Sequence, residues 1–249
     1  TQAKTLFPYT TLFRSPPPSA AGEGCREGGG VRTAWRPLGL GDVRGDLACR
    51  GQGPVEHGVG FDLEPADLLA ESKRYLKEMV STPSAMFLDL RARLDRFLFT
   101  RGYDRRTRFD PAELERLRQR MRTHPTVLLF THKSYIDASL PTLLLYSNDL
   151  PMLHTFGGIN MDFAGFGTLV RRSGGIFIRR SFQDNAVYKL VLRKYVGYLL
   201  EKRFPMSWAL EGTRSRLGKL MPPRYGLLKY TLDAAHDSGI EDVHIYAFV

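Results

Sequence analysis

The sequence has few cysteines and no long hydrophobic run. Cys25 and Cys49 are the only cysteines among 249 residues, and they lack the Cys-x-x-Cys or Cys/His spacing of a metal site. This argues against a disulfide scaffold and a bound metal, and it indicates a reducing compartment. No apolar run approaches the roughly 20 residues that a membrane-spanning helix needs, so we expect any membrane contact of this chain to be peripheral. The N-terminus lacks a basic segment followed by an apolar one, which argues against secretion.

Acidic residues are scarce relative to basic ones. Lysine and arginine number 36 against 26 aspartates and glutamates, which gives a net charge of +10. Such an excess indicates an anionic partner, and a phosphorylated metabolite, an anionic bilayer surface and a nucleic acid all qualify. Arginine clusters within residues 91–122, 171–180 and 214–216. The alternative for most of these arginines is an ordinary solvated helix face.

Residues 1–60 differ in composition from the rest of the chain. They contain half of the 24 glycines and the run Pro16-Pro17-Pro18, and they show no apolar periodicity. We interpret this stretch as disordered or as non-native leader sequence, because it offers little apolar surface for a core.

Helical patterns fill residues 61–124. Residues 61–80 and 84–99 carry apolar side chains at helical spacing among many charges. A third helix has a marked start, because Asp110 can cap it and Glu113 can complete a capping box. The sequence therefore predicts a small helical region here.

Beyond residue 124 the pattern alternates between strands and helices. Short apolar runs typical of buried strands occupy residues 126–131, 151–156, 175–178, 204–210 and 243–249. Helical patterns between them occupy residues 134–146, 162–172, 182–203 and 225–236. This alternation predicts an α/β fold with a mainly parallel sheet flanked by helices. Because the chain stops inside its last expected strand, we interpret residues 125–249 as an α/β domain truncated at its C-terminus.

His132 and Asp137 follow the first of these strands. Histidine suits proton transfer near neutral pH, and a nearby carboxylate can fix its tautomer and stabilise the imidazolium. The pair needs a turn between its members, because five residues of continuous helix would rotate the two side chains apart. The alternative for His132 is a hydrogen-bonded structural histidine, which is how we interpret His154 on a later expected strand.

Arg179 and Arg180 follow the apolar run at residues 175–178. An arginine at this place offers a planar fork to a phosphate or a carboxylate. Adjacent strand positions point to opposite faces, so only one of the two is expected to face a given pocket while the strand continues. The alternative is a pair of surface cations at the end of a strand.

Residues 211–219 form a basic loop after another expected strand. Gly212 permits a sharp turn there. Arg214, Arg216 and Lys219 could cradle an anion, although the spacing of a Walker loop is absent. The alternative is a basic loop on the surface without a ligand. In a parallel sheet the loops that follow the strands share one edge, which is where such sheets bind ligands.

Three blocks, taken in order, resemble those of the glycerophospholipid acyltransferase superfamily. They are His-Lys-Ser-Tyr-Ile-Asp at 132–137, Gly-Gly-Ile-Phe-Ile-Arg-Arg at 174–180 and Glu-Gly-Thr-Arg-Ser-Arg at 211–216. The resemblance covers about residues 126–249. Lysophosphatidate acyltransferases usually begin the first block with Asn-His and end the second with Asp-Arg, whereas this chain has Thr131-His132 and Arg-Arg. The blocks therefore look like those of glycerol-3-phosphate acyltransferases and their dihydroxyacetone-phosphate relatives.

The resemblance implies an enzyme that moves a fatty acyl group to the sn-1 hydroxyl of glycerol 3-phosphate, the first step of phospholipid synthesis. The donor would be acyl-CoA or acyl carrier protein, with no further cofactor, no metal and no nucleic-acid partner. His132, oriented by Asp137, would remove the hydroxyl proton. The residues implied at the phosphate are Arg179, Arg214 and Arg216, with Arg180 and Lys219 beside them, while Glu211 and Gly212 shape the loop. We expect peripheral docking on the anionic cytoplasmic face of the cell membrane, because the product is amphiphilic and the surface is rich in arginine.

Two further functions stay open from the sequence. Within the superfamily, the acceptor could instead be dihydroxyacetone phosphate or lysophosphatidate. From another class, a non-catalytic basic module that binds nucleic acid or an anionic membrane would explain the charge. Such a module gives no reason for His132 and Asp137 to follow a buried strand.

Overall fold

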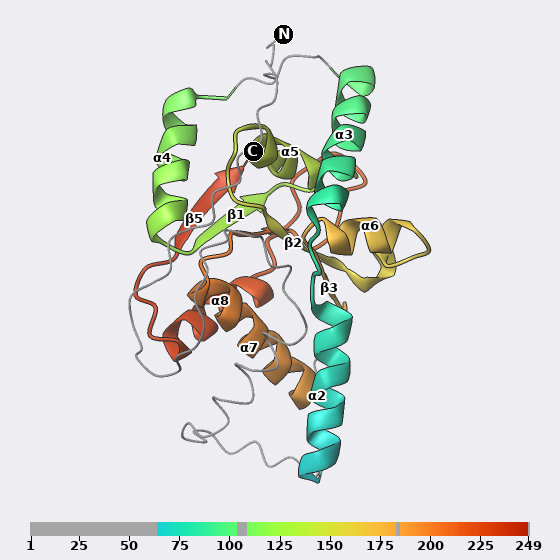
Figure 1. Cartoon of the computed structure of the whole chain (residues 1–249), viewed down its shortest axis with the longest axis vertical. Coiled ribbons are helices and arrows are strands. Elements are labelled where there is room, and N and C mark those ends of the chain that lie inside the picture. Colours follow the sequence, from blue (N-terminus) through green and yellow to red (C-terminus); the bar gives the residue numbers. More distant parts are fainter. Residues whose placement is uncertain (1–63, 104–108, 183–184, 249) are drawn as a thin grey trace, which may run out of the picture.

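The computed structural model describes residues 64–103, 109–182 and 185–248, so the interpretation of residues 1–60 lies outside the described part of the chain. Five strands form one parallel sheet in the order β3-β2-β4-β1-β5 (Figure 1). The strands are β1 (Thr126–Phe130), β2 (His154–Gly158), β3 (Gly175–Ile178), β4 (Met206–Ala209) and β5 (His244–Phe248). The predicted parallel α/β sheet flanked by helices is confirmed.

Helices precede the sheet and cover both of its faces. They are α2 (Pro65–Met79), α3 (Ala85–Gly102), α4 (Pro111–Thr123), α5 (Ser139–Ser147), α6 (Phe166–Arg172), α7 (Ala186–Glu201) and α8 (Gly226–Asp237), with a 3-10 turn η1 (Ile159–Met161). The predicted cap of α4 is confirmed, because the Asp110 side chain accepts a hydrogen bond from the backbone N of Ala112 at 2.8 Å. The predicted capping box is wrong in its second half: the Glu113 carboxylate accepts instead from Arg116 at 2.6 Å.

Helix α5 begins later than the sequence predicts. The pattern placed its start at residue 134, but turns occupy the chain up to Ala138. The Asp137 carboxylate accepts hydrogen bonds from the backbone N of Lys133 at 2.5 Å and of Ser134 at 2.6 Å. Such side-chain bonds offer the backbone a turn in place of a helix, which explains the delayed start.

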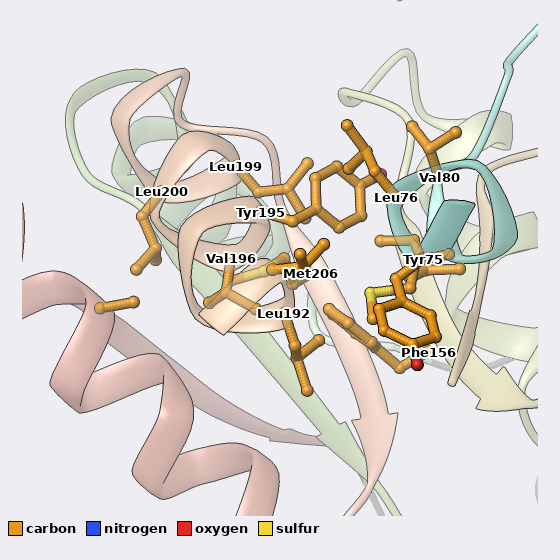
Figure 2. Packing of buried hydrophobic residues seen from close by; sticks show 14 of the residues in the cluster. Tyr75, Leu76, Val80, Phe156, Leu192, Tyr195, Val196, Leu199, Leu200 and Met206 are labelled. Atoms are coloured by element: carbon orange, nitrogen blue, oxygen red, sulfur yellow. The ribbon is translucent and has the colours of Figure 1, made fainter. Parts of the chain in front are cut away.

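One face of the sheet packs against α2, α7 and α8. Val127 of β1, Met206 of β4 and Trp208 of β4 belong to the same buried cluster as these helices. Figure 2 shows Tyr75 of α2 on one side of this cluster and Tyr195 of α7 near its centre. Helix α2 therefore shares the core of the sheet, although it lies far ahead of the strands in sequence.

The opposite face packs against α4 and α5, and α3 packs on α5 in turn. Leu117 of α4, Leu128 of β1 and Leu145 of α5 lie in one buried cluster. Leu88 of α3 and Leu143 of α5 lie in another. Within the described residues, no helix is both long enough and apolar enough to cross a membrane.

The chain at the end of α2 is hydrogen-bonded to α6 and to the start of β2, near the N-terminal edge of the sheet. Arg171 donates to the backbone O of Glu78 at 2.8 Å and of Val80 at 3.0 Å. Ser81 Oγ lies 3.1 Å from Nδ1 of His154, which is 1% exposed at the start of β2. The interpretation of His154 as a structural histidine is therefore confirmed.

The strand order determines which loops are neighbours at the C-terminal edge of the sheet. Phe130 of β1 lies opposite Ala209 of β4, so the residues two positions further on, His132 and Glu211, leave the sheet side by side. Strand β3, which leads into Arg179, is separated from β1 by β2 and β4. At roughly 4.8 Å per strand this places the two ends about 14 Å apart.

Candidate active site

Two hydrogen bonds of the His132 backbone join the loop after β1 to the loop after β4. The backbone N of His132 donates to Oε2 of Glu211 at 2.9 Å. The backbone O of His132 accepts from the backbone N of Ser215 at 2.8 Å. Both polar groups of the His132 backbone are thus used to fix its position, and both of these bonds are to residues of the segment 211–215.

Glu211 and Gly212 shape this loop. The Glu211 side chain is 4% exposed, and its second oxygen accepts from the backbone N of Met221 at 3.2 Å. Gly212 has φ +66°, and a Cβ at this position would come within 2.9 Å of Cδ of Arg224. A side chain at residue 212 would therefore be strained by conformation and by space, which agrees with the predicted sharp turn.

The His132 imidazole is half-buried between charges of both signs. Its ring lies edge-on to Phe130, with centroids 6.1 Å apart. Burial lowers the pKa of His132, the Asp137 and Glu211 carboxylates raise it, and Arg214 lowers it again. Since burial dominates and the ordinary value is near 6.5, the ring is mainly neutral at pH 7, as a general base must be.

Asp137 lies next to His132 but is held by its own turn. Besides the two backbone bonds described above, its carboxylate accepts from Oγ of Ser134 at 2.7 Å. In the part of the chain that the structure describes, no hydrogen bond joins this carboxylate to the His132 ring. The Asp137 charge raises the pKa of His132, and the predicted orientation of the ring by Asp137 stays a prediction.

The cations of the basic loop are arranged differently from one another. Arg214 stacks on the ring of Tyr135, with its guanidinium carbon 4.3 Å from the centroid, while Arg216 and Lys219 are exposed. The Ser215 hydroxyl is buried and, among the described residues, has no hydrogen-bond partner. A buried hydroxyl without a partner is a candidate ligand group, because such atoms are normally satisfied.

The two arginines after β3 point to different surroundings. Arg179 forms an ion pair with Glu78 of α2, at 2.6 Å between Nη2 and Oε2. Arg180 is exposed, and its Nε lies 3.6 Å from the place that a Cβ would take at Gly158, the end of β2. The structure therefore brings His132, Glu211 and the basic loop together, and of the two arginines it places only Arg180 beside the neighbouring strand end.

The contacts of three residues in this arrangement were not predicted from the sequence. Tyr135 lies inside the first block, and an aromatic side chain in a turn beside a predicted cationic loop could have indicated its stacking role. Glu78 and Tyr75 gave no such signal, because they lie about a hundred positions from Arg179 on an amphipathic helix. Within residues 64–103, 109–182 and 185–248, no three His, Cys, Asp or Glu side chains gather as a metal site would require.

Comparison with known proteins identifies the family of this chain. The provisionally named acyltransferase plsB1 of Mycobacterium tuberculosis is 34% identical over 182 residues, which cover 73% of this chain and 29% of that protein. The dihydroxyacetone phosphate acyltransferase of Bos taurus is 36% identical over 144 residues, which cover 56% of this chain and 21% of that protein. The chain thus spans less than a third of the length of these relatives. Residues 111–249, more than half of the chain, match the protein family Acyltransferase, and the chain belongs to that family.

Proposed function

We propose that this chain carries the site that transfers a fatty acyl group from an acyl thioester to the sn-1 hydroxyl of glycerol 3-phosphate. The observation that supports this most is the half-buried imidazole of His132, whose backbone is bonded to Glu211 and Ser215 at the two ends of the segment 211–215. A base and a phosphate-binding loop are thereby held as one unit. The thioester, from acyl-CoA or acyl carrier protein, acts as the second substrate, and the proposed step uses no resident cofactor.

The proposed reaction is a direct transfer. His132 accepts the proton of the acceptor hydroxyl as its oxygen attacks the thioester carbonyl. The new oxygen–acyl bond forms, the carbon–sulfur bond breaks, and the proton passes from the imidazolium to the departing thiolate. The Asp137 carboxylate stabilises the transient positive charge of the ring, since its charge favours the protonated form. Proton transfer of this kind contributes typically 10²- to 10⁴-fold to the rate.

The acceptor needs a phosphate group as well as a hydroxyl. Arg214, Arg216 and Lys219 place three cations on the loop bonded to His132. The same loop carries the Ser215 hydroxyl, which has no hydrogen-bond partner among the described residues. Dihydroxyacetone phosphate also presents a phosphate and a primary hydroxyl, and the Bos taurus relative is named for that acceptor. Thr131-His132 and Arg179-Arg180 distinguish these two acceptors from lysophosphatidate but not from each other. We therefore take glycerol 3-phosphate as the first choice, and an acceptor panel decides between the two.

An acceptor panel tests this proposal. The purified chain is incubated with labelled acyl-CoA and, in parallel, with glycerol 3-phosphate, dihydroxyacetone phosphate or lysophosphatidate. We expect the largest kcat/KM with glycerol 3-phosphate. A larger value with another acceptor reassigns the substrate within the family. No transfer to any acceptor, together with salt-sensitive binding of RNA or DNA, would favour a basic binding module instead.

We also propose that the chain docks on an anionic membrane surface, at the cytoplasmic face, through the outer side of α3. Five large apolar side chains of this helix are exposed: Met86 by 67%, Leu90 by 53%, Leu94 by 41%, Phe97 by 54% and Leu98 by 43%. Arg93 and Arg101 are exposed among them.

The acidic residues of α3 point away from this surface. Asp95 is buried and bonded to Arg91 at 2.7 Å, and Asp89 accepts from the Tyr146 hydroxyl. The exposed side of α3 is therefore apolar and basic without an acid, which is the composition of helices that lie in an anionic bilayer interface. Helix α4 has the opposite character, because it exposes glutamates and arginines together.

Vesicle sedimentation tests the docking surface. The chain is mixed with vesicles of zwitterionic lipid alone or with added anionic lipid, and we expect binding that needs the anionic lipid and weakens with salt. The double variant Leu90→Gln/Phe97→Gln should lose most of it. The matched control changes Leu69→Gln and Leu232→Gln, two exposed leucines on α2 and α8, and should bind normally. Unchanged binding of the α3 variant, or an α3-dependent dimer without vesicle binding, contradicts the proposal.

A further inference from the structure

The Arg179 guanidinium is held by a carboxylate that lies 101 positions earlier in the chain. Its Nε donates to Oε1 of Glu78 at 2.7 Å and its Nη2 to Oε2 at 2.6 Å. Two parallel bonds of this kind are among the strongest that a guanidinium forms. The Glu78 side chain is only 17% exposed, so the pair is well shielded from water on the glutamate side.

Two tyrosine rings complete the surroundings of Arg179. Its guanidinium carbon lies 4.9 Å from the ring centroid of Tyr75 on α2 and 5.3 Å from that of Tyr188 on α7. The backbone N of Arg179 donates to the Tyr188 hydroxyl at 2.9 Å, and Asn185 donates to the Tyr75 hydroxyl at 2.6 Å. To reach a substrate, Arg179 would have to give up the ion pair and both ring contacts, so this side chain is suited to fix the chain rather than to bind a ligand.

Arg180, one residue further, is in the opposite situation. Its side chain is exposed, and among the described residues no carboxylate forms an ion pair with it. Its Nε lies close to Gly158 at the end of β2, which is the strand between β3 and β4. The side chain therefore leans across the C-terminal edge toward the strands that lead to Glu211 and His132.

We propose that Glu78 is a positioning residue of the acyltransferase site: it fixes Arg179 against α2, and this directs Arg180 toward the phosphate of the acceptor. The inference rests on the proposed function and deepens it. Glu78 lies outside residues 111–249, the part that matches the family, so a helix ahead of that part would contribute to acceptor binding.

Binding and kinetics of three variants test this inference. Calorimetry measures the affinity for glycerol 3-phosphate without turnover, and the transfer assay separates KM from kcat. Loss of a charged hydrogen bond in Arg180→Ala should weaken binding and raise KM for the acceptor by roughly 10- to 100-fold. Glu78→Gln should raise the same KM by a smaller factor and leave kcat and the KM of the thioester unchanged. The matched control Glu113→Gln, which changes an exposed ion-paired glutamate on α4, should behave as the original chain.

The double variant Glu78→Gln/Arg180→Ala decides how Glu78 acts. If Glu78 works through Arg180, the double variant should be little worse than Arg180→Ala alone, because coupled residues do not add. Full additivity, or a lower KM in Glu78→Gln because Arg179 is released to bind the phosphate, overturns the inference. Should Glu78→Gln fail to fold, Arg179→Lys, which keeps the charge and gives up the paired bond, carries the same comparison. Equal affinity of Arg180→Ala and the original chain for glycerol 3-phosphate also overturns it, whereas failure of the original chain to transfer to any acceptor overturns the proposed function.

Discussion

Two histidines lie near opposite edges of the sheet, His154 at the start of β2 and His132 just after β1, and they differ in what surrounds them. His154 begins β2, is 1% exposed and shares a hydrogen bond with Ser81, and its ring packs on Phe204. His132 follows β1, is half-buried and lies among the charges of Asp137, Glu211 and Arg214. Burial lowers the pKa of both, to about 4 for His154.

The two neutral imidazoles differ in whether they can accept a proton while the chain stays folded. His154 uses Nδ1 in the fold and is sealed from solvent, so a proton can reach it only at the expense of the native structure. His132 is fixed through its backbone, which leaves its ring without a hydrogen bond in the described part of the chain and close to carboxylates that can stabilise a proton. Desolvation alone thus gives a structural histidine, whereas desolvation that is partly offset by nearby charges leaves His132 suited to the role of base that we propose for it.

Replacing each of the two histidines should produce the largest effects, on activity for His132 and on stability for His154. His132→Gln should lower kcat by about 10²- to 10⁴-fold, because the base is gone. It should change the free energy of unfolding much less, by about 0.5 kcal/mol, since no described residue forms a hydrogen bond with the ring. His154→Ala should lower the free energy of unfolding by roughly 1–3 kcal/mol, because Ser81 loses its buried partner. Urea unfolding and the transfer assay measure both quantities, and a His132→Gln variant that turns over normally would remove His132 from the mechanism.

The acid sensitivity of the fold should depend on His154. In the unfolded chain the His154 ring binds a proton below about pH 6.5, whereas in the folded chain its pKa is about 4. The contribution of this ring to stability is therefore complete above pH 6.5 and is lost as the pH falls toward 4. Since each pKa unit corresponds to about 1.4 kcal/mol, the loss from this group is about 3 kcal/mol. The free energy of unfolding, measured from pH 7 to pH 4, should fall less steeply in His154→Gln, which cannot titrate. Equal slopes in both proteins would contradict the assignment.

Removing the support of His132 should have a somewhat smaller effect. In Glu211→Ala the backbone N groups of His132 and Met221 both lose their acceptor, which costs about 1–3 kcal/mol of stability and should reduce kcat as the base loses its place. Glu211→Gln keeps one acceptor oxygen, so its stability and kcat should lie between those of the original chain and of Glu211→Ala. The control Glu113→Ala, which removes an exposed ion pair, should change stability by less than about 1 kcal/mol. Equal effects of Glu211→Ala and Glu113→Ala would show that the buried carboxylate is not needed.

The sequence allowed the sheet to be predicted better than its surroundings. Buried parallel strands are continuous apolar runs between helices, so their places and the shared C-terminal edge could be predicted. The start of α5 could not, because the Asp137 carboxylate competes with the helix for the backbone N groups of Lys133 and Ser134. Such competition depends on side-chain geometry that periodicity does not contain.

The candidate site shows the same division. That His132 and residues 211–216 follow neighbouring strands depends on β4 inserting between β2 and β1, an order that the alternation of elements does not determine. The pairing of Arg179 with Glu78 was also beyond prediction, because nothing local distinguishes Glu78 from the other charges of α2. The pairing depends on the tertiary position of α2, which packs against α7 (Figure 2).

The smallest expected effect, on the pH dependence of transfer, tests the origin of the His132 pKa. Because burial lowers this pKa, the acidic limb of kcat/KM should have its midpoint below pH 6.5. Arg214→Gln removes a cation that lowers the pKa, so the limb should move to higher pH. Asp137→Asn removes a carboxylate that raises it, so the limb should move to lower pH. Each movement should be less than about one pH unit, because solvent screens charges around a half-buried ring. Opposite movements in the two variants would show that the titrating group lies near both charges, as His132 does and the buried His154 does not, and movements in the same direction would assign the limb to another group.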